Sequence, residues 1–398
     1  MMKRISRSIV TLALLCATPA GAMLVGDVPD NVMDTACALP ESAFDAQIFS
    51  AVEREHVISG IFDITINDAA GVGYNDPVLG ADRMLCLTTA AGMYSDVLIT
   101  HTPIELLAGF PEMFANATSA VLGATGTSGW ARDFPGAPIA NTWYQGALAD
   151  THAGTDLVPS QFDIVMNMNR AIDDPATLGG RTWYYGTDAN PGVNFDCITV
   201  LLHELAHGLG LTTRMLRCGD VNNPDCAAFV LGSPAATMRN MEDHTLGMWT
   251  DITREERIVS GTGGTRMHQV GPRTRLESAR FSQGKTGDHV QYHSPGSVSS
   301  GSSWSHPSTT MFPNDLMEPF YPGASHDIRL VLGILEDQGW PTTRVGTVTT
   351  SSTTSTTLSP PICSSQCDLD GNGRESATDA LIALRVATVI ETCPNVCQ

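Results

Sequence analysis

The stretch TVLLHELAHGLGLTT, residues 199–213, determines how the rest of the chain is interpreted. Its apolar residues recur at helical spacing, and Asp196 stands just upstream, where a helix N-cap is expected. Gly208 and Gly210 follow closely. Glycine weakens a helix interior and tolerates the left-handed turn that commonly ends a helix. The stretch therefore predicts a buried helix over residues 199–209 that stops with a sharp turn.

Two histidines on this helix are four residues apart. His203 and His207 therefore lie on one face, a turn apart, where both imidazoles can bind one metal ion. Glu204 stands beside them, in position to accept a proton from water on that metal and to pass it to a leaving amine. Two metal ligands with a general base between them are typical of zinc metalloproteases. The alternative is a surface helix with two hydrogen-bonded histidines.

A catalytic zinc ion usually has three protein ligands and an open fourth position. Thr213, near the end of the stretch, offers only a neutral hydroxyl, which is a weak donor beside an imidazole or a carboxylate. The third ligand must then come from farther along the chain. The downstream residues that remain open are Glu242, His244, His268, His289, His293, His306 and His326.

Two motifs resemble one family of proteins. HELAHGLG, residues 203–210, resembles the first part of the metzincin signature. WSHPSTTMFPNDLMEP, residues 304–319, resembles the second part as it occurs in the leishmanolysin-like branch of that family. The resemblance covers roughly residues 120–340 and points to secreted bacterial metalloproteases of this lineage. It implies that His306 is the third zinc ligand and that Met317 is the methionine of the turn beneath the metal.

The resemblance also implies a fold and a function. The fold expected is α+β, with a metzincin-like catalytic domain in which Gly210 makes the turn after the zinc helix. The function expected is that of a secreted zinc-dependent endopeptidase, which cleaves protein or peptide substrates with a zinc-bound water assisted by Glu204. A second hypothesis is a non-catalytic secreted adhesion or attachment protein that binds zinc and calcium and retains the zinc helix without using it for hydrolysis.

Other segments support a mixed α+β domain. QFDIVMNM, residues 161–168, alternates apolar side chains as a strand does, and RTWYYG, residues 181–186, is an aromatic strand or strand end. Residues 79–98 have a helical pattern. A mixed sheet is therefore expected upstream of the zinc helix. Residues 261–303 are rich in Gly, Ser and Thr and are predicted to be mostly irregular, with no inserted accessory domain between Gly210 and His306.

The N-terminus has the features of a secretory signal peptide. A basic start at Lys3, Arg4 and Arg7 precedes a short apolar run and small residues that end at Ala22. The apolar run is well short of the roughly 20 residues that a spanning helix needs. Residues 1–22 are therefore predicted to be a signal peptide of a secreted protein without a membrane span.

The chain is strongly acidic. Its formal net charge of −20 becomes −23 when the three basic residues of the predicted signal peptide leave, because that segment contains no acidic residue. Such a surface argues against a nucleic-acid partner and against binding to an anionic membrane, and it suits a secreted protein or one that binds divalent cations.

The composition changes after Trp340. Residues 345–361 are dominated by Thr and Ser and end in two prolines, so they are predicted to be an extended linker. This linker separates a zinc metallopeptidase domain at residues 23–344 from a small module at residues 362–398.

The small module contains a calcium-loop pattern, DLDGNGRESATD, at residues 368–379. Its third and fifth positions and its ends carry oxygen donors, and Gly373 stands at the position of the sharp turn. Aspartate at the last position resembles the dockerin form of the EF-hand, which implies calcium binding and a cohesin-like or cell-surface partner. The alternative is a polar turn that binds no ion. The predicted calcium ligands are Asp368, Asp370, Asn372, Arg374 and Asp379.

The cysteines fit an exported protein. Ten cysteines less Cys16 of the signal peptide leave nine, an odd number, so at least one thiol is expected to be free. Cys218 and Cys226 bracket a short loop and are expected to form a disulfide. Four cysteines near the C-terminus are also expected to form disulfides: Cys363, Cys367, Cys393 and Cys397. No partner is assigned to Cys37, Cys86 or Cys197.

Overall fold

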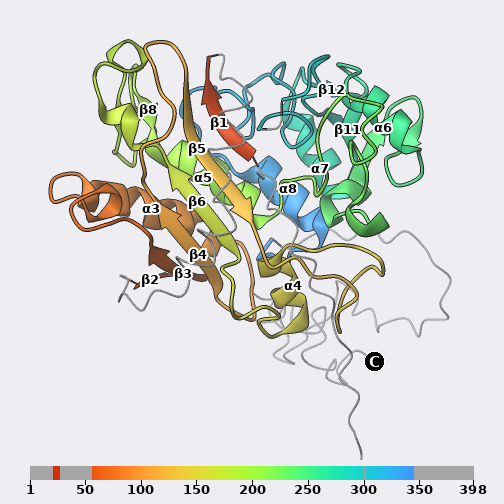
Figure 1. Ribbon diagram of the computed structural model, residues 1–398, viewed down its shortest axis with the longest axis horizontal. Helices are drawn as coiled ribbons and strands as arrows, with labels where there is room; N and C mark the ends of the chain where they lie inside the picture. Colours follow the sequence, from red (N-terminus) through yellow and green to blue (C-terminus); the bar gives the residue numbers. More distant parts are fainter. Residues whose placement is uncertain (1–20, 27–55, 300, 345–398) are drawn as a thin grey trace, which may run out of the picture. The chain divides into compact units, whose positions relative to one another are not determined.

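The computed structural model describes residues 21–26, 56–299 and 301–344 (Figure 1). Residues 1–20 of the predicted signal peptide, Cys37, the predicted linker and the whole predicted calcium-loop module, with its four cysteines, lie outside the described residues. The expectations for those segments therefore remain predictions.

A six-stranded mixed sheet organises the first half of the described chain, in the order β1-β5-β6-β4-β3-β2 (Figure 1). The neighbours β3, β4 and β6 are parallel, whereas β1, β5 and β2 run antiparallel to their partners. This agrees with the predicted α+β class and with a mixed sheet upstream of the helix that carries His203 and His207. The strands are β1 (Gly21–Val25), β2 (His56–Ser59), β3 (Phe62–Ile66), β4 (Ile104–Gly109), β5 (Ala120–Thr127) and β6 (Ile164–Met168).

Two helices pack against this sheet, α3 (Gly80–Ser95) and α5 (Cys197–Leu209). They touch each other through the hydroxyl of Tyr94, which donates a hydrogen bond of 2.8 Å to the carbonyl of Leu202. The helix α5 lies so close to β6 that a Cβ at Gly208 would be 2.5 Å from the side chain of Ile164. Both helices begin and end near the predicted positions.

Further helices surround this core. They are α4 (Gly146–Ala153), α6 (Arg254–Gly261), α7 (Pro272–Glu277) and α8 (Arg329–Gln338). Short 3-10 helices lie at Gly73–Asn75, Arg170–Asp173, Leu178–Gly180, Val230–Gly232, Ala236–Asn240 and Ser278–Arg280. Among the described residues, no helix combines the length and the apolar character needed to cross a membrane.

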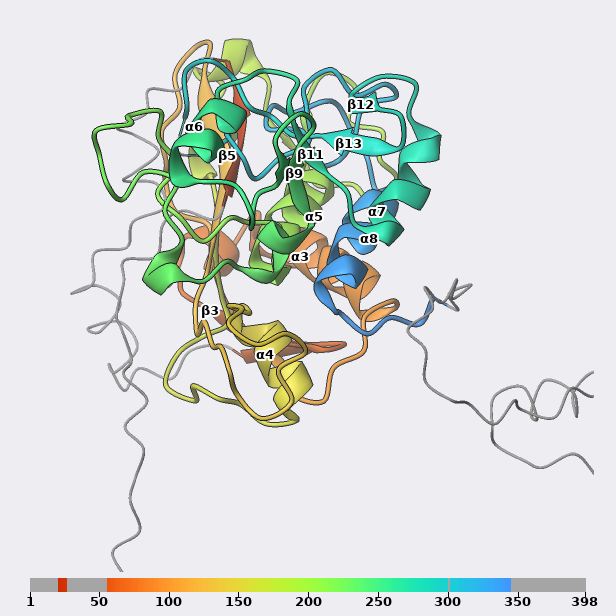
Figure 2. The same cartoon turned by 90° about the vertical axis from the view of Figure 1, so that its right-hand side faces the viewer.

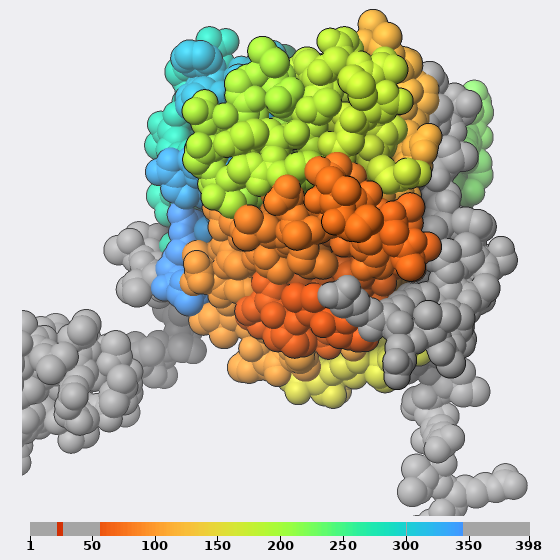
Figure 3. All heavy atoms as spheres, turned by 90° about the vertical axis from the view of Figure 1, so that its left-hand side faces the viewer, coloured from red at the N-terminus to blue at the C-terminus, as the bar shows by residue number. Residues whose placement is uncertain are grey.

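The segment that leads into α5 lies beside the region of α3, as the face drawn in Figure 3 shows in yellow-green and orange. Arg83 of α3 forms an ion pair of 2.8 Å with Asp173, and Tyr185 donates a hydrogen bond of 2.6 Å to the same carboxylate. The aromatic segment predicted as a strand contains β7 (Trp183–Tyr184), which pairs in parallel with β8 (Phe195–Asp196). These contacts fix the start of α5.

The region between α5 and His306 differs from its prediction. Within the described residues it contains a five-stranded antiparallel sheet, in the order β10-β9-β11-β13-β12 (Figure 2). A second hydrophobic cluster surrounds Trp249 and Trp304. Most of residues 261–303 are irregular, as predicted, but the short strands and the helix α7 within this stretch were not expected. Strands of two or three residues are too short to leave a periodic pattern in the sequence. They are β9 (Met241–Asp243), β10 (Gly247–Met248), β11 (Met267–Gln269), β12 (Lys285–Thr286) and β13 (His289–Gln291).

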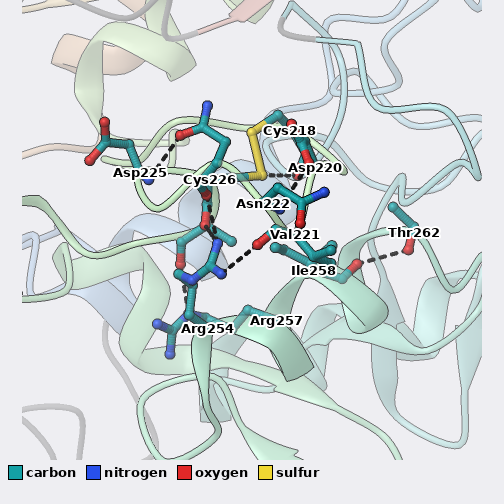
Figure 4. Close-up of a disulfide and its surroundings, with 12 residues drawn as sticks. Cys218, Asp220, Val221, Asn222, Asp225, Cys226, Arg254, Arg257, Ile258 and Thr262 are labelled. Atoms are coloured by element: carbon teal, nitrogen blue, oxygen red, sulfur yellow. Dashed lines mark hydrogen bonds between the residues drawn. A yellow bond between two sulfur atoms is a disulfide. The ribbon is translucent and has the colours of Figure 1, made fainter.

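The predicted disulfide between Cys218 and Cys226 is present (Figure 4). Arg254 of α6 holds the loop between these cysteines, because its guanidinium donates hydrogen bonds of 2.8 and 2.7 Å to the carbonyls of Val221 and Asn223. Elsewhere in the described part of the chain, two cysteines have free thiols, and both are buried: Cys86 and Cys197.

Candidate metal centre

The helix α5 begins with the predicted cap. Oδ1 of Asp196 accepts a hydrogen bond of 2.7 Å from the main-chain N–H of Thr199. The same oxygen lies 2.9 Å from Nε2 of His326, and the hydroxyl of Tyr321 accepts a hydrogen bond of 2.9 Å from the N–H of Asp196. His326 and Tyr321 therefore support the start of the helix. All residues of α5 are buried, so its polar side chains have been withdrawn from water.

The helix ends at Gly210, as predicted. Gly210 has φ = 133°, and its N–H donates to the carbonyls of Ala206 and His207, each at 3.1 Å. A Cβ there would be 1.9 Å from Nε2 of Gln145, so both conformation and space require glycine. The turn carries the next carbonyl, that of Leu211, to Nδ1 of His207 at 2.7 Å. The end of the helix therefore orients one of its histidines.

Three histidines converge at this helix. Nε2 of His203 and Nε2 of His207 are 3.0 Å apart, and Nε2 of His306 lies 3.2 and 3.0 Å from them. All three side chains are fully buried. His306 comes from a segment about a hundred residues beyond the helix, so the fold brings together the residues that the two sequence motifs contain.

Each of these imidazoles is held by its other nitrogen. Nδ1 of His203 lies 2.9 Å from the carbonyl of Leu316, Nδ1 of His207 lies 2.7 Å from that of Leu211, and Nδ1 of His306 lies 2.8 Å from that of Ser302. A carbonyl only accepts hydrogen bonds, so Nδ1 carries the proton in every ring. The three Nε2 atoms are then lone-pair donors that face one another.

The environment favours the neutral form of all three rings. Burial lowers the pKa of His203 to about 4. Burial, followed by the charge of the neighbouring imidazoles, holds the pKa of His207 and of His306 well below the usual range. Three facing lone pairs repel one another unless a cation lies between them. Nitrogens at about 2.0–2.1 Å from a tetrahedral zinc ion lie about 3.3 Å apart, so the donor set fits such an ion.

Glu204 lies next to this centre on the helix and is fully buried. Burial raises the pKa of its carboxyl to about 8, and the hydrogen bond from the main chain of Met23 works against that rise. Oε1 accepts that hydrogen bond at 3.0 Å, whereas Oε2 is buried and has no hydrogen-bond partner among the described residues. A buried carboxylate oxygen without a partner has a strong tendency to bind a donor such as water.

The strand β5 passes directly over Glu204. A Cβ at Gly123 would be 2.8 Å from Cγ and 3.0 Å from Oε1 of Glu204, so glycine is needed for the carboxylate to take this position. This residue could not be identified from the sequence, because a lone glycine within a strand indicates only that some close approach occurs and not which side chain makes it.

The edge strand β1 lies beside the same carboxylate. It pairs antiparallel with β5, and on its other side the N–H of Leu24 donates to the carbonyl of Pro319, while the N–H of Tyr321 donates to the carbonyl of Leu24, each at 3.0 Å. An extended segment thus lies between two backbone edges, next to Glu204. The predicted end of the signal peptide, residue 22, falls inside this strand.

Met317 lies in a buried turn that touches the histidine centre. Oδ1 of Asp315 accepts a hydrogen bond of 2.9 Å from the N–H of Met317, and Oε1 of Glu318 accepts one of 2.9 Å from the N–H of Asp315. The carbonyl of Leu316, between them, is the acceptor for His203. The turn therefore helps to orient a histidine, and the side chain of Met317 is fully buried.

The other downstream residues do not join the three histidines. His293 lies against Phe320, with ring centroids 6.3 Å apart, and His326 lies at the cap of α5. The remaining four gather on the second sheet: Glu242, His244, His268 and His289. Glu242, one of the candidates for the third zinc ligand, is thus part of a different cluster.

The chain was compared with family models, with curated proteins and with solved structures, and no match was found in any of the three. The support for a function therefore comes from the geometry of the site and from the two sequence motifs.

Proposed function

We propose that the protein is a zinc-dependent endopeptidase of metzincin type, with His203, His207 and His306 as the zinc ligands and Glu204 as the general base. One observation carries the proposal: three buried, neutral imidazoles direct their Nε2 atoms at one point, beside a buried carboxylate. Three protein ligands with an open fourth position are the usual arrangement of a catalytic zinc site.

A zinc ion at this centre would polarise the carbonyl of the scissile bond and would lower the pKa of water. Glu204 accepts the proton of the attacking water and returns it to the nitrogen of the leaving amine. The pKa of about 8 for Glu204 applies when no cation lies beside the carboxyl. A positive charge at the neighbouring imidazoles favours the carboxylate and so prepares Glu204 to act as a base near neutral pH.

The backbone edges around β1 favour a polypeptide substrate. The carbonyl of Pro319 and the N–H of Tyr321 pair with Leu24 on one side of this strand, and β5 pairs with it on the other. A peptide that added itself between these edges would be recognised through its main chain, whatever its side chains. In the described arrangement residues 21–25 take that place themselves, and Met23 holds Glu204.

The direct test is cleavage of an unfolded protein substrate by the purified protein. Hydrolysis should disappear when a chelator removes the metal and should return when zinc is added back. Zinc binding without any cleavage would favour the non-catalytic attachment protein instead. Secretion and calcium binding by residues 368–379 remain part of the proposal, because the segments that carry them lie outside the described residues.

A further inference from the structure

The second sheet brings four polar side chains to one of its faces. In the antiparallel pair of β9 and β11, Glu242 lies directly opposite His268. Directly opposite residues project to the same face, and so do residues two apart on one strand. His244 follows the strand in a turn, and its ring lies 5.1 Å from that of His268, centroid to centroid, so it lies on the same side of the sheet. So does His289, because Gln291, two residues on, is opposite His268 in the pair of β11 and β13.

The side chains on this face are close enough to share an ion. One ligand atom each from Glu242, His244 and His268 lies within 4.8 Å of the other two, as is also the case for the three histidines of the candidate metal centre. Nδ1 of His289 lies 2.5 Å from Oε1 of Glu242, and Nδ1 of His244 lies 3.6 Å from the same oxygen.

The backbone holds the two histidine ligands in place. The carbonyl of Arg266 accepts hydrogen bonds from the N–H of His244 at 2.8 Å and from Nδ1 of His268 at 2.9 Å. Oδ1 of Asp243 accepts from the N–H groups of Thr245 and Leu246, at 2.8 and 2.9 Å, and so fixes the turn that carries His244. The ring of His268 and the backbone of His244 are therefore held by contacts that leave Nε2 of His268 and the imidazole of His244 to bind a ligand.

The hydrogen bonds also determine the donor atoms. Since Nδ1 of His268 donates to a carbonyl, its Nε2 has a lone pair, which now faces the hydroxyl of Thr286 at 3.0 Å. A cation bound at Nε2 would replace this hydrogen bond. His289 donates a hydrogen bond to Oε1 of Glu242, so Oε2 of this carboxylate remains to bind a cation. The same hydrogen bond orients the carboxylate, as residues hydrogen-bonded to metal ligands commonly do.

From this register and these contacts, we propose a second metal site, in which Glu242, His244 and His268 bind a divalent cation of the zinc class and His289 positions Glu242. Two imidazoles and one carboxylate suit zinc and its neighbours among the transition metals, whereas calcium and magnesium require mainly oxygen ligands. The side chain of His244 is 49% exposed, so the cation can enter from solvent. The ion would connect β9 to β11, and the proposal does not depend on catalysis at the other centre.

The experiment measures zinc bound to the full chain, stripped of metal and dialysed against a fixed concentration of free zinc. His244→Ala and Glu242→Gln should each bind one zinc ion fewer per chain than the wild type. Glutamine keeps the shape of the side chain at residue 242 and an oxygen that can accept from His289. A loss of zinc in this variant is therefore not explained by misfolding. His101→Ala, at an exposed histidine outside both clusters, should bind as much zinc as the wild type.

His207→Ala separates the two centres. This variant keeps the second site, so zinc should raise its melting temperature, and the rise should disappear in the double variant His207→Ala/His244→Ala. Wild-type zinc content in both His244→Ala and Glu242→Gln would overturn the proposal. The readout is metal content and melting temperature, so it stays separate from any failure of the proposed peptidase activity.

Discussion

The main-chain N–H of Met23 donates a hydrogen bond of 3.0 Å to Oε1 of Glu204, so the edge strand of the sheet and the buried carboxylate of α5 are directly connected. This contact occupies the proposed catalytic base with the protein's own backbone. It also places β1 where the proposed function needs a substrate strand.

Met23→Pro removes this N–H, and the proposed peptidase should become more active as a result. A hydrogen bond to a charged group contributes about 1.5–3 kcal/mol, so the rate of peptide cleavage should rise on the order of tenfold or more. Met23→Ala keeps the N–H and is the matched control. Both are compared in the unprocessed chain, from which the predicted signal peptide has not been removed, and N-terminal sequencing checks that residues 21–26 are retained. Equal rates in the two variants would show that the contact does not restrain Glu204.

Gly123→Ala should disable the base without removing the metal. The new Cβ would be 2.8 Å from Cγ of Glu204 and would push the carboxylate out of position. A displacement of about 1 Å at a reacting group can lower a rate about 100-fold, so kcat should fall by this order while zinc content stays constant. Gly126→Ala lies on the same strand, and its Cβ would meet no atom within 4 Å, so its kcat should match the wild type.

His306→Ala tests the ligand that is most distant in sequence. Loss of one of three ligands should greatly weaken zinc binding at the proposed catalytic centre and abolish cleavage. The measurements are zinc affinity and hydrolysis of a protein substrate, with His101→Ala as the control. Wild-type activity in His306→Ala would mean that another residue completes the catalytic site.

The pH dependence of stability can be tested at Asp163. Burial raises the pKa of this carboxyl to about 8, above its ordinary value of 3.8. The folded state then binds the extra proton, so this stability is fully present below about pH 4 and is lost as the pH rises towards 8. Asp163→Asn stays neutral throughout and can still accept from the N–H of Glu105, which now donates to Oδ2 at 3.0 Å.

Chemical denaturation at pH 5 and pH 8 measures this effect. From pH 5 to pH 8 the free energy of unfolding should fall by at least about 1 kcal/mol more in the wild type than in Asp163→Asn. The reason is that each pH unit changes this free energy by up to about 1.4 kcal/mol for one proton. Asp225→Asn, at an exposed position, should behave as the wild type does. An identical loss in wild type and Asp163→Asn would mean that Asp163 is ionised in the folded protein.

The sequence predicted the helix α5 well, because its signals are local. Asp196 caps the first turn and Gly210 ends the last one, and both depend only on the backbone within a few residues. The position of His306 beside His203 is not local. Residue spacing left several downstream histidines open, and only the resemblance of the second motif selected His306.

The register of the second sheet could not be predicted. Its strands have two or three residues, and their pairing depends on contacts between distant segments such as Glu242 and His268. For the same reason the glutamate and histidines of that sheet looked like scattered candidates for one zinc ion. The role of β1 was missed because its small and apolar residues also fit the end of a signal peptide.

The central claim is tested most directly by measuring zinc content and protein cleavage together, in the wild type and in Glu204→Gln. The wild type should bind zinc and cleave the substrate. Glutamine keeps the size of the side chain and cannot accept the proton, so Glu204→Gln should retain the zinc and cleave about 10²–10⁴-fold more slowly. Undiminished cleavage by Glu204→Gln would show that Glu204 is not the general base.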